Sequence, residues 1–236
     1  MAGSLKLQQF TAAQIAQQQE RGVLILDTRA AELFASAHVC GAMQLGLMGP
    51  FAGWAAILIA PTHRLLIVAE DEASAHEARI RLARVGLEHV AGFTLADEKQ
   101  WRHHGIRLAT LHIVACKDVC RDQQEGRTHQ LIDVRSLAEW LQGHLPGALS
   151  IPLLELNSEA PPIDFSKPSL VYCREGYRAT TAASVLLRRN ARDVGIMIDA
   201  IECIDRPQAG GAAPATPPGT PLDGLEVSSL VHLCDK

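Results

Sequence analysis

Short apolar runs alternate with segments of helical spacing along the chain. Apolar runs that end at Asp27 and Asp133 read as strands, and two later segments, Leu65–Leu82 and Ser169–Leu186, each combine an apolar run, a polar turn and a helical pattern. In the last segment, helical spacing places these apolar residues on one face: Ala179, Ala182, Ala183, Leu186 and Leu187. Strands that alternate with helices predict an α/β fold, with parallel sheets flanked by helices.

The same arrangement occurs twice. The segment Leu24–Ala42 matches Gln130–Ala148 at an offset of 106 residues. The residues repeated at that offset are Asp27 and Asp133, Arg29 and Arg135, Phe34 and Trp140, His38 and His144, and Gly41 and Gly147. A period this long exceeds that of solenoid repeats, so each copy is expected to be a whole domain.

The repeat predicts the domain organisation. We expect a first domain over 1–108 and a second over 109–206, joined near Arg107–Leu111, with opening helices at Ala12–Gln19 and Ala115–Gln124. The remaining 207–236 begin with a stretch rich in Pro, Gly and Ala, which is typical of an extended linker and tail.

Composition narrows the function classes. With 47% hydrophobic and 20% charged residues, the chain of 236 residues is not globally disordered. Its net charge of -4 and the lack of a Lys/Arg cluster argue against a nucleic-acid partner. The longest apolar run, Phe51–Pro61, is too short to span a bilayer, and no secretory leader is expected at Met1. Six Cys do not suggest a disulfide scaffold, so we expect a cytoplasmic protein with reduced thiols and no membrane partner.

Candidate chemistry concentrates in the second copy, in the loop C-R-E-G-Y-R between a strand and a helix. The helix N-terminus favours an anion, Gly176 permits the torsions of an amide nest, and Arg174 and Arg178 add positive charge. In that field the thiol of Cys173 is expected to ionise readily and become nucleophilic. The competing interpretation is an inert buried cysteine at a strand end, which is the commoner fate of a free cysteine.

These motifs together resemble the rhodanese superfamily of sulfurtransferases, present as a tandem pair from about Phe10 to Pro207. The residues that carry the resemblance are Asp133-x-Arg135, His144-x-Pro146-Gly147-Ala148 and the loop from Cys173 to Arg178. The resemblance implies that Cys173 takes up a sulfane sulfur as a persulfide. It also implies a substrate cradle formed by Arg174, Glu175, Gly176, Tyr177 and Arg178. Asp133, Arg135 and His144 match positions with a structural role.

The first copy lacks the nucleophile. Alignment of the two helices places Ala69 opposite Cys173, and the acidic loop that follows would repel an anion. This half is therefore predicted to be inert in sulfur transfer, with a structural or substrate-cleft role. Cys40, in the turn motif of the first copy, is expected to be a small turn or core residue.

Loop details bear on the substrate. The C-x4-R spacing is shorter than the C-x5-R loop of cysteine phosphatases, and arsenate reductases of this fold also carry the longer loop, so a phosphatase or an arsenate reductase is the weaker alternative. Glu175 offsets one arginine and should weaken attraction for a dianion such as thiosulfate. The donor is expected to be thiosulfate or a low-molecular-weight persulfide, or a partner protein's persulfide, and the acceptor a thiol or cyanide. A non-catalytic persulfide sensor or sulfur carrier remains an alternative from another class.

No cofactor is implied, because the chain has neither a P-loop nor a G-x-G-x-x-G motif. His112, Cys116 and Cys120 are spaced as H-x3-C-x3-C, which would place them on one helical face. A metal site needs a fourth ligand, so we expect ordinary packing there and no metal.

Overall fold

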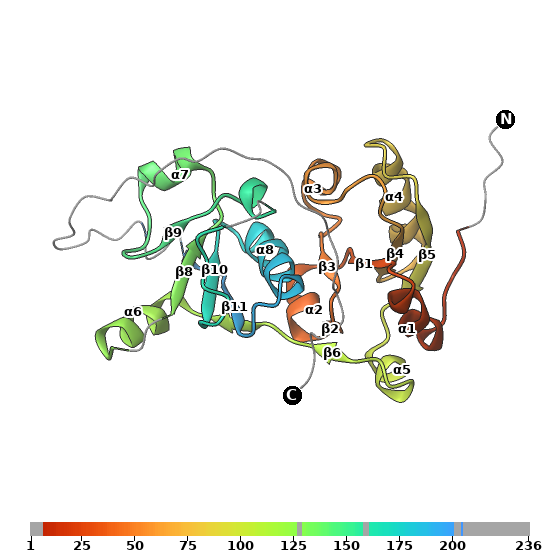
Figure 1. Ribbon diagram of the computed structural model, residues 1–236, viewed down its shortest axis with the longest axis horizontal. Coiled ribbons are helices and arrows are strands. Elements are labelled where there is room, and N and C mark those ends of the chain that lie inside the picture. The colour runs from red at the N-terminus through yellow and green to blue at the C-terminus, as the bar shows by residue number, and fades with distance from the viewer. Residues whose placement is uncertain (1–6, 127–128, 158–160, 201–203, 205–236) are drawn as a thin grey trace.

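The chain forms two parallel β-sheets, one in each half, and helices cover both (Figure 1). The structure is a computed structural model that describes residues 7–126, 129–157, 161–200 and 204. It confirms the predicted α/β fold with parallel sheets. The predicted tail over 207–236 lies outside the described residues.

The first sheet has the strand order β3-β1-β4-β5. Its strands are β1 (Leu24–Asp27), β3 (Met43–Gln44), β4 (Leu65–Ala69) and β5 (Val90–Leu95). The helices of this half are α1 (Ala12–Glu20), α2 (Ala31–Ser36), α3 (Phe51–Leu58), α4 (Glu72–Ala83) and α5 (Glu98–His103). Both central strands, β1 and β4, are buried along their whole length, as helices on both faces of a parallel sheet require.

The second sheet has the strand order β7-β11-β10-β8-β9. Its strands are β7 (His112–Val114), β8 (Gln130–Asp133), β9 (Leu149–Ser150), β10 (Ser169–Tyr172) and β11 (Val194–Met197). Its helices are α6 (Cys116–Gln124), α7 (Leu137–Gln142), the 3-10 turn η1 (Leu153–Glu155) and α8 (Tyr177–Arg188). The chain crosses from one sheet to the other between β6 (Leu108–Ala109), which pairs with β2 (His38–Val39), and β7.

The sequence repeat is reproduced in side-chain geometry. In each half an arginine folds back onto the aspartate two residues before it, with Nη2–Oδ2 distances of 2.6 Å for Arg29 and 2.7 Å for Arg135. The same guanidinium also donates to the carbonyl that ends the following helix, at Ala37 and Gly143 respectively. These buried Asp–Arg ion pairs link the end of a strand to the end of the helix that follows, which is a structural role.

The two histidines of the repeat also match. His38 stacks on Phe34 at 3.8 Å, and His144 stacks on Trp140 at 3.6 Å. In both, Nδ1 lies within hydrogen-bond distance of the backbone carbonyl of the same aromatic residue. His144 is therefore held by the end of α7.

Helix α8 lies between the two halves (Figure 1). It packs on β10 and β11 with one side and on β3 and α2 of the first half with the other. All residues from Ala179 to Leu186 are buried, although the pattern in the sequence predicted one buried face. The extra buried positions are Val185 and three small hydroxyl residues, Thr180, Thr181 and Ser184, which donate to carbonyls three or four residues back.

The predicted shared helical face of His112, Cys116 and Cys120 is wrong. His112 belongs to strand β7, which pairs with β11 at the edge of the sheet, whereas Cys116 begins α6.

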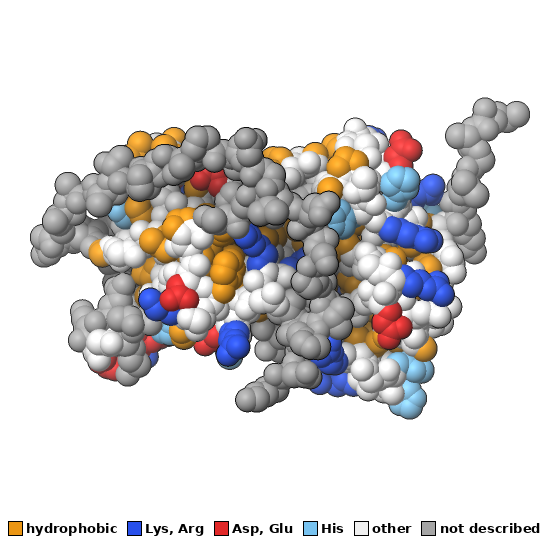
Figure 2. All heavy atoms as spheres, in the orientation of Figure 1, with side chains coloured by type: hydrophobic (Ala, Val, Ile, Leu, Met, Phe, Trp, Pro, Cys, Tyr) orange, Lys and Arg blue, Asp and Glu red, His pale blue; other side chains and the backbone are white. Residues whose placement is uncertain are grey.

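Among the described residues no helix is long and apolar enough to cross a membrane. On the face shown in Figure 2, acidic and basic side chains are interspersed over the first half.

Candidate active site

The loop after β10 presents Cys173 at the start of α8. Gly176 caps this helix with φ 84°, a left-handed conformation that glycine adopts without strain, and no side chain caps the helix here. The N–H of Ala179, in the first turn, points at the Cys173 sulfur with an N–S distance of 3.4 Å. The sulfur therefore occupies the place where a helix N-terminus attracts negative charge.

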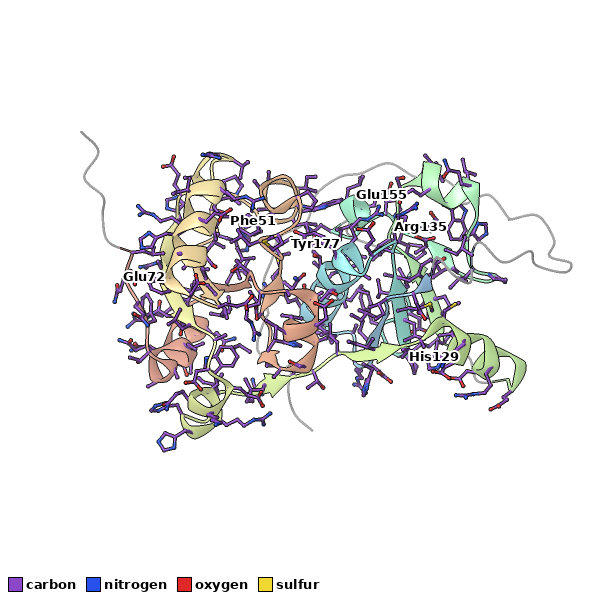
Figure 3. All side chains as sticks on the ribbon, turned by 180° about the vertical axis from the view of Figure 1, so that it is seen from behind. Phe51, Glu72, His129, Arg135, Glu155 and Tyr177 are labelled. Carbon is purple, nitrogen blue, oxygen red and sulfur yellow. The ribbon has the colours of Figure 1, made fainter. Side chains whose placement is uncertain are left out.

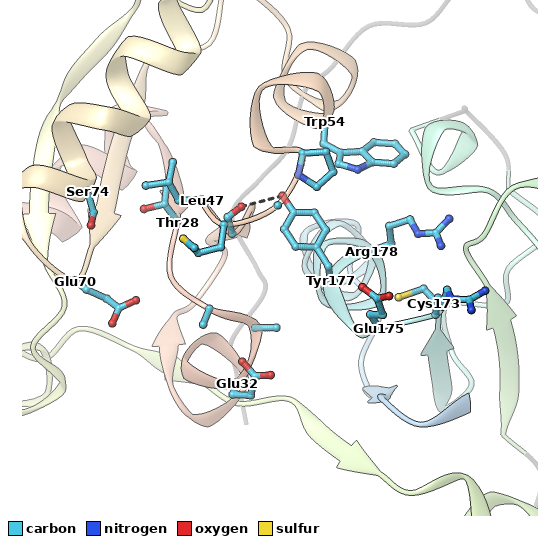
Figure 4. Close-up of a pocket in the computed structure, with 17 residues that line it drawn as sticks. Thr28, Glu32, Leu47, Trp54, Glu70, Ser74, Cys173, Glu175, Tyr177 and Arg178 are labelled. Atoms are coloured by element: carbon cyan, nitrogen blue, oxygen red, sulfur yellow. Dashed lines mark hydrogen bonds between the residues drawn. The ribbon is translucent and has the colours of Figure 1, made fainter. Parts of the chain in front are cut away.

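Cys173 lines a cavity of about 640 Å³ that both halves form (Figure 4). The loop contributes Cys173, Arg174, Glu175, Tyr177 and Arg178. The first half contributes residues that follow β1, β3 and β4: Thr28, Ala30, Ala31, Glu32, Gly46, Leu47, Met48, Gly49, Pro50, Trp54, Glu70 and Ser74. The carboxyl ends of strands from both sheets thus face one cavity, as expected for a binding site in a parallel α/β fold.

Arg178 lines the cavity, but its charge is engaged. Its Nη1 and Nη2 donate to the two carboxylate oxygens of Glu139 on α7, both at 2.7 Å. This bidentate bond, with hydrogen bonds from Ser136, lowers the pKa of Glu139 to about 2. The guanidinium expected to cradle the substrate is thus held by a carboxylate from α7.

Tyr177 connects the loop to the first half. Its hydroxyl donates to the Gly46 carbonyl at 3.0 Å, and its ring lies so close to Gly49 that a Cβ there would be 2.3 Å from Cε2 (Figures 3 and 4). Burial raises the pKa of Tyr177 to about 12. One wall of the cavity is therefore built from the contact between Tyr177 and the segment between β3 and α3.

Further hydrogen bonds hold α8 against the first half. The backbone N–H of Gln44 donates to Ser184 Oγ at 3.0 Å, and the Thr181 hydroxyl donates to Gln44 Oε1 at 3.1 Å. Arg188 donates to the Gly41 carbonyl at 2.6 Å. The first half thus covers the helix whose N-terminus holds Cys173.

The corresponding helix of the first half has a different N-terminus. Helix α4 follows Ala69, which ends β4, and Asp71 caps it by accepting the Ser74 N–H at 2.7 Å. A carboxylate of the chain itself already occupies the anion position of α4. The inertness of the first half stays a prediction; at the position that matches the Cys173 loop, this half has neither a thiol nor an open helix terminus.

The described cysteines differ in state. Cys173 is a buried free thiol, whereas Cys40 and Cys116 are disulfide-bonded. The expectation that these two are ordinary packed thiols is therefore wrong. Among the described residues, no three His, Cys, Asp or Glu side chains are grouped as a metal ion would require.

The residues expected at the Cys173 site from the sequence are not the same set as the residues that line the cavity in the structure. Five of the six loop residues from Cys173 to Arg178 line the cavity; Gly176 is buried and is not part of the lining, and Asp133, Arg135 and His144 also lie outside it. The sequence reasoning missed the carboxylate partner Glu139 and the wall from the first half, including Glu32, Trp54 and Glu70. The Ser136-x-x-Glu139 spacing signals a helix capping box, which is present, but it does not reveal the bond to Arg178.

Comparison with known proteins identifies part of the chain. Residues 117–202 match the family model of the rhodanese-like domain. The uncharacterized protein YqhL of Bacillus subtilis is 37% identical over 68 residues, which cover 29% of this chain and 54% of that protein. The HTH-type transcriptional regulator Rv0324 of Mycobacterium tuberculosis is 34% identical over 74 residues, which cover 31% of this chain and 32% of that protein. The chain thus spans about half the length of the first of these relatives and a third of the second.

Among solved structures, the thiosulfate sulfurtransferase from Pseudomonas aeruginosa aligns with 81% of this chain and 41% of its own, at 21% identity and a TM-score of 0.36. The match to the family model includes β8, α7, β10 and α8, and with them the whole Cys173 loop. Residues 117–202, which contain the Cys173 loop, are thus similar to the rhodanese-like domain of the rhodanese superfamily.

Proposed function

We propose that the protein is a sulfurtransferase that carries a sulfane sulfur as a persulfide on Cys173. One observation carries the proposal: the Cys173 sulfur accepts the Ala179 N–H at the uncapped N-terminus of α8, and it faces a cavity of about 640 Å³. A thiolate or persulfide anion is stabilised at such a helix terminus, and the cavity gives donor and acceptor access to it. The rhodanese-like domain around Cys173 supports the same reaction class.

The reaction has two steps. In the first, the Cys173 thiolate attacks the outer sulfur of the donor, the S–S bond breaks, and its electron pair leaves with sulfite or a thiolate. In the second, an acceptor thiolate or cyanide attacks the outer sulfur of the enzyme persulfide and Cys173 leaves as a thiolate. Amide N–H groups of the loop stabilise the anionic sulfur in each step, and the scheme requires ping-pong kinetics.

The donor in this proposal is thiosulfate or a low-molecular-weight persulfide, and the acceptor is a thiol or cyanide. A protein partner that presents a persulfide also fits a cavity open to solvent at the exposed Arg174 and Glu175. Phosphatase chemistry is disfavoured by the loop, because C-x4-R leaves a short cradle and Arg178 is bonded to Glu139.

The first half acts in this proposal as a wall of the cavity and a support for α8, without chemistry of its own. A cytoplasmic location stays a prediction from the sequence. The disulfide bonds of Cys40 and Cys116 weigh against it, because cytosolic thiols are kept reduced.

The test is steady-state sulfur transfer to cyanide from thiosulfate and from glutathione persulfide, with wild type, Cys173→Ala and Cys173→Ser. We expect turnover in wild type and none in either variant, while thermal denaturation shows that the variants remain folded. Mass spectrometry after donor treatment should find one added sulfur atom on Cys173.

Other outcomes would change the assignment. Activity that survives in both variants would refute Cys173 as the sulfur carrier. A single persulfide on Cys173 without turnover would point to the sensor or carrier alternative.

A further inference from the structure

The positive charges of the Cys173 loop are each accompanied by a carboxylate. Arg174 is followed by Glu175, and both side chains are exposed at the cavity. Arg178 forms the bidentate ion pair with Glu139. The loop therefore offers no net cation to an incoming anion, and Glu32 and Glu70 of the first half add negative charge to the same cavity (Figure 4).

Glu139 is well placed to hold Arg178. The side chains of the pair are 23% and 28% exposed, so water screens the pair less than it would at an open surface. Glu139 Oε2 also accepts from the Ser136 N–H and from Ser136 Oγ, both at 2.9 Å, which fixes the carboxylate at the start of α7. Arg178 therefore has a rigid partner on one side, and the donor must compete with this carboxylate for the guanidinium.

We infer that Glu139 is a specificity-determining residue that holds and neutralises Arg178, so that the site discriminates against dianionic donors such as thiosulfate. The favoured donor class is a persulfide whose charges lie away from the reacting sulfur. This inference rests on the proposed sulfur transfer. Glu139 acts through Arg178, outside the cavity lining, and is a positioning residue.

The physical reason lies in the first step. A thiolate and thiosulfate bring three negative charges together, and that approach needs a cation that is free to offset them. With Arg178 neutralised, the compensation left is the N-terminus of α8, the Ala179 N–H and the exposed Arg174, whose charge the neighbouring Glu175 offsets. An organic persulfide that reacts in its protonated form, RS–SH, has no charge on the outer sulfur; the proton stays on the transferred sulfur and the thiolate RS⁻ leaves, so less compensation is needed.

The test compares kcat/KM for thiosulfate with kcat/KM for glutathione persulfide in the same protein sample. Glu139→Gln keeps the shape and removes the charge, and it should raise the thiosulfate-to-persulfide ratio by about tenfold. Using a ratio within one sample cancels any change in stability or in the fraction of active protein.

Two further variants make the test specific. Ser136→Ala removes one of the two Ser136 hydrogen bonds to Glu139 but keeps the bond from the backbone N–H, the carboxylate charge and the pair with Arg178, so the ratio should stay within about twofold of wild type. Arg178→Gln leaves Glu139 uncompensated and should lower the ratio, so it tests the inference even if Glu139→Gln does not fold. An unchanged ratio in Glu139→Gln, or an equal rise in Ser136→Ala, would overturn the inference.

A separate readout distinguishes this inference from the proposed function. If wild type uses neither donor, sulfur transfer is refuted, and the charge at Cys173 is then measured by alkylation. Iodoacetate is an anion and iodoacetamide is neutral, and mass spectrometry follows their rates at Cys173. Glu139→Gln should raise the iodoacetate-to-iodoacetamide rate ratio several-fold, whereas an unchanged ratio would show that Glu139 does not control the charge there.

Discussion

Replacing Gly49 with alanine tests whether the first half positions the Cys173 loop. A Cβ at residue 49 would lie 2.3, 2.6 and 2.8 Å from three carbons of the Tyr177 ring, more than 0.5 Å inside the closest ordinary contact of 3.4 Å. The Tyr177 hydroxyl is bonded to the Gly46 carbonyl, so the ring cannot yield without losing that hydrogen bond. Overpacking of this kind costs about 1–3 kcal/mol, and about 2 kcal/mol lowers the melting temperature of a chain this size by about 4–8 °C.

The matched control is Gly53→Ala, four residues further along. A Cβ at Gly53 would meet nothing within 4 Å, and Gly53 lies inside α3. Alanine should there raise the free energy of unfolding by roughly 0.5–1 kcal/mol. Thermal denaturation and sulfur transfer are measured for both variants, and Gly49→Ala should lower both stability and kcat/KM, since Tyr177 begins α8.

A double-mutant cycle assigns the effect to the contact. In a Tyr177→Ala background the ring is absent, and Gly49→Ala should then change the free energy of unfolding by less than about 0.5 kcal/mol. If Gly49→Ala destabilises equally in both backgrounds, or is as stable as Gly53→Ala, the reasoning about this interface is wrong.

Three further outcomes are expected. Burial raises the pKa of both tyrosines, that of Tyr177 to about 12, so tyrosinate absorbance should be absent from the folded protein at pH 10. The stability that comes from the neutral Tyr177 hydroxyl is present below pH 10 and is lost as the pH rises towards 12. The pKa of Glu139 falls from 4.5 to about 2 on folding, so its ion pair with Arg178 stabilises the protein above pH 4.5 and loses this effect towards pH 2. Denaturant titrations should therefore show that the difference in unfolding free energy between wild type and Glu139→Gln shrinks from pH 4.5 to pH 2. Arg81 donates to the Leu47 and Gly49 carbonyls at 2.6 and 3.1 Å, so Arg81→Gln should increase hydrogen exchange in the segment between β3 and α3.

Local patterns in the sequence were sufficient for the strand–loop–helix around Cys173 and for the repeated Asp–Arg pairs. Asp133 and Arg135 are two residues apart, and their bond depends on the backbone turn that follows β8. The same holds for the start of α1 at Ala12, where the Thr11 N–H donates to the Gln14 side chain three residues later. Predictions of this kind succeed because the interacting groups are close in the chain.

Contacts between distant segments could not be inferred in the same way. The bond between Arg178 and Glu139 joins residues 39 apart, and the bond between Tyr177 and Gly46 joins residues 131 apart. The helical pattern of α8 correctly gave the apolar face that packs on its own sheet. Nothing in that pattern indicated that Thr181 and Ser184 would be buried against Gln44, because serine and threonine are mostly exposed in proteins.

The two halves share the Asp–Arg geometry of the repeat and differ at the helix terminus that follows β4 and β10. The Asp27–Arg29 pair retains the geometry of Asp133–Arg135, because that pair stabilises a strand end whatever the site does. The position that matches Cys173 is Ala69, and Asp71 fills the helix terminus that an anion would need. Gln44, Gly46 and Gly49 meanwhile contact α8 of the other half. The first half therefore affects the Cys173 site through the surface that contacts α8 and not through its own loop after β4. Substitutions at Gly49 should impair the site more than substitutions at Ala69.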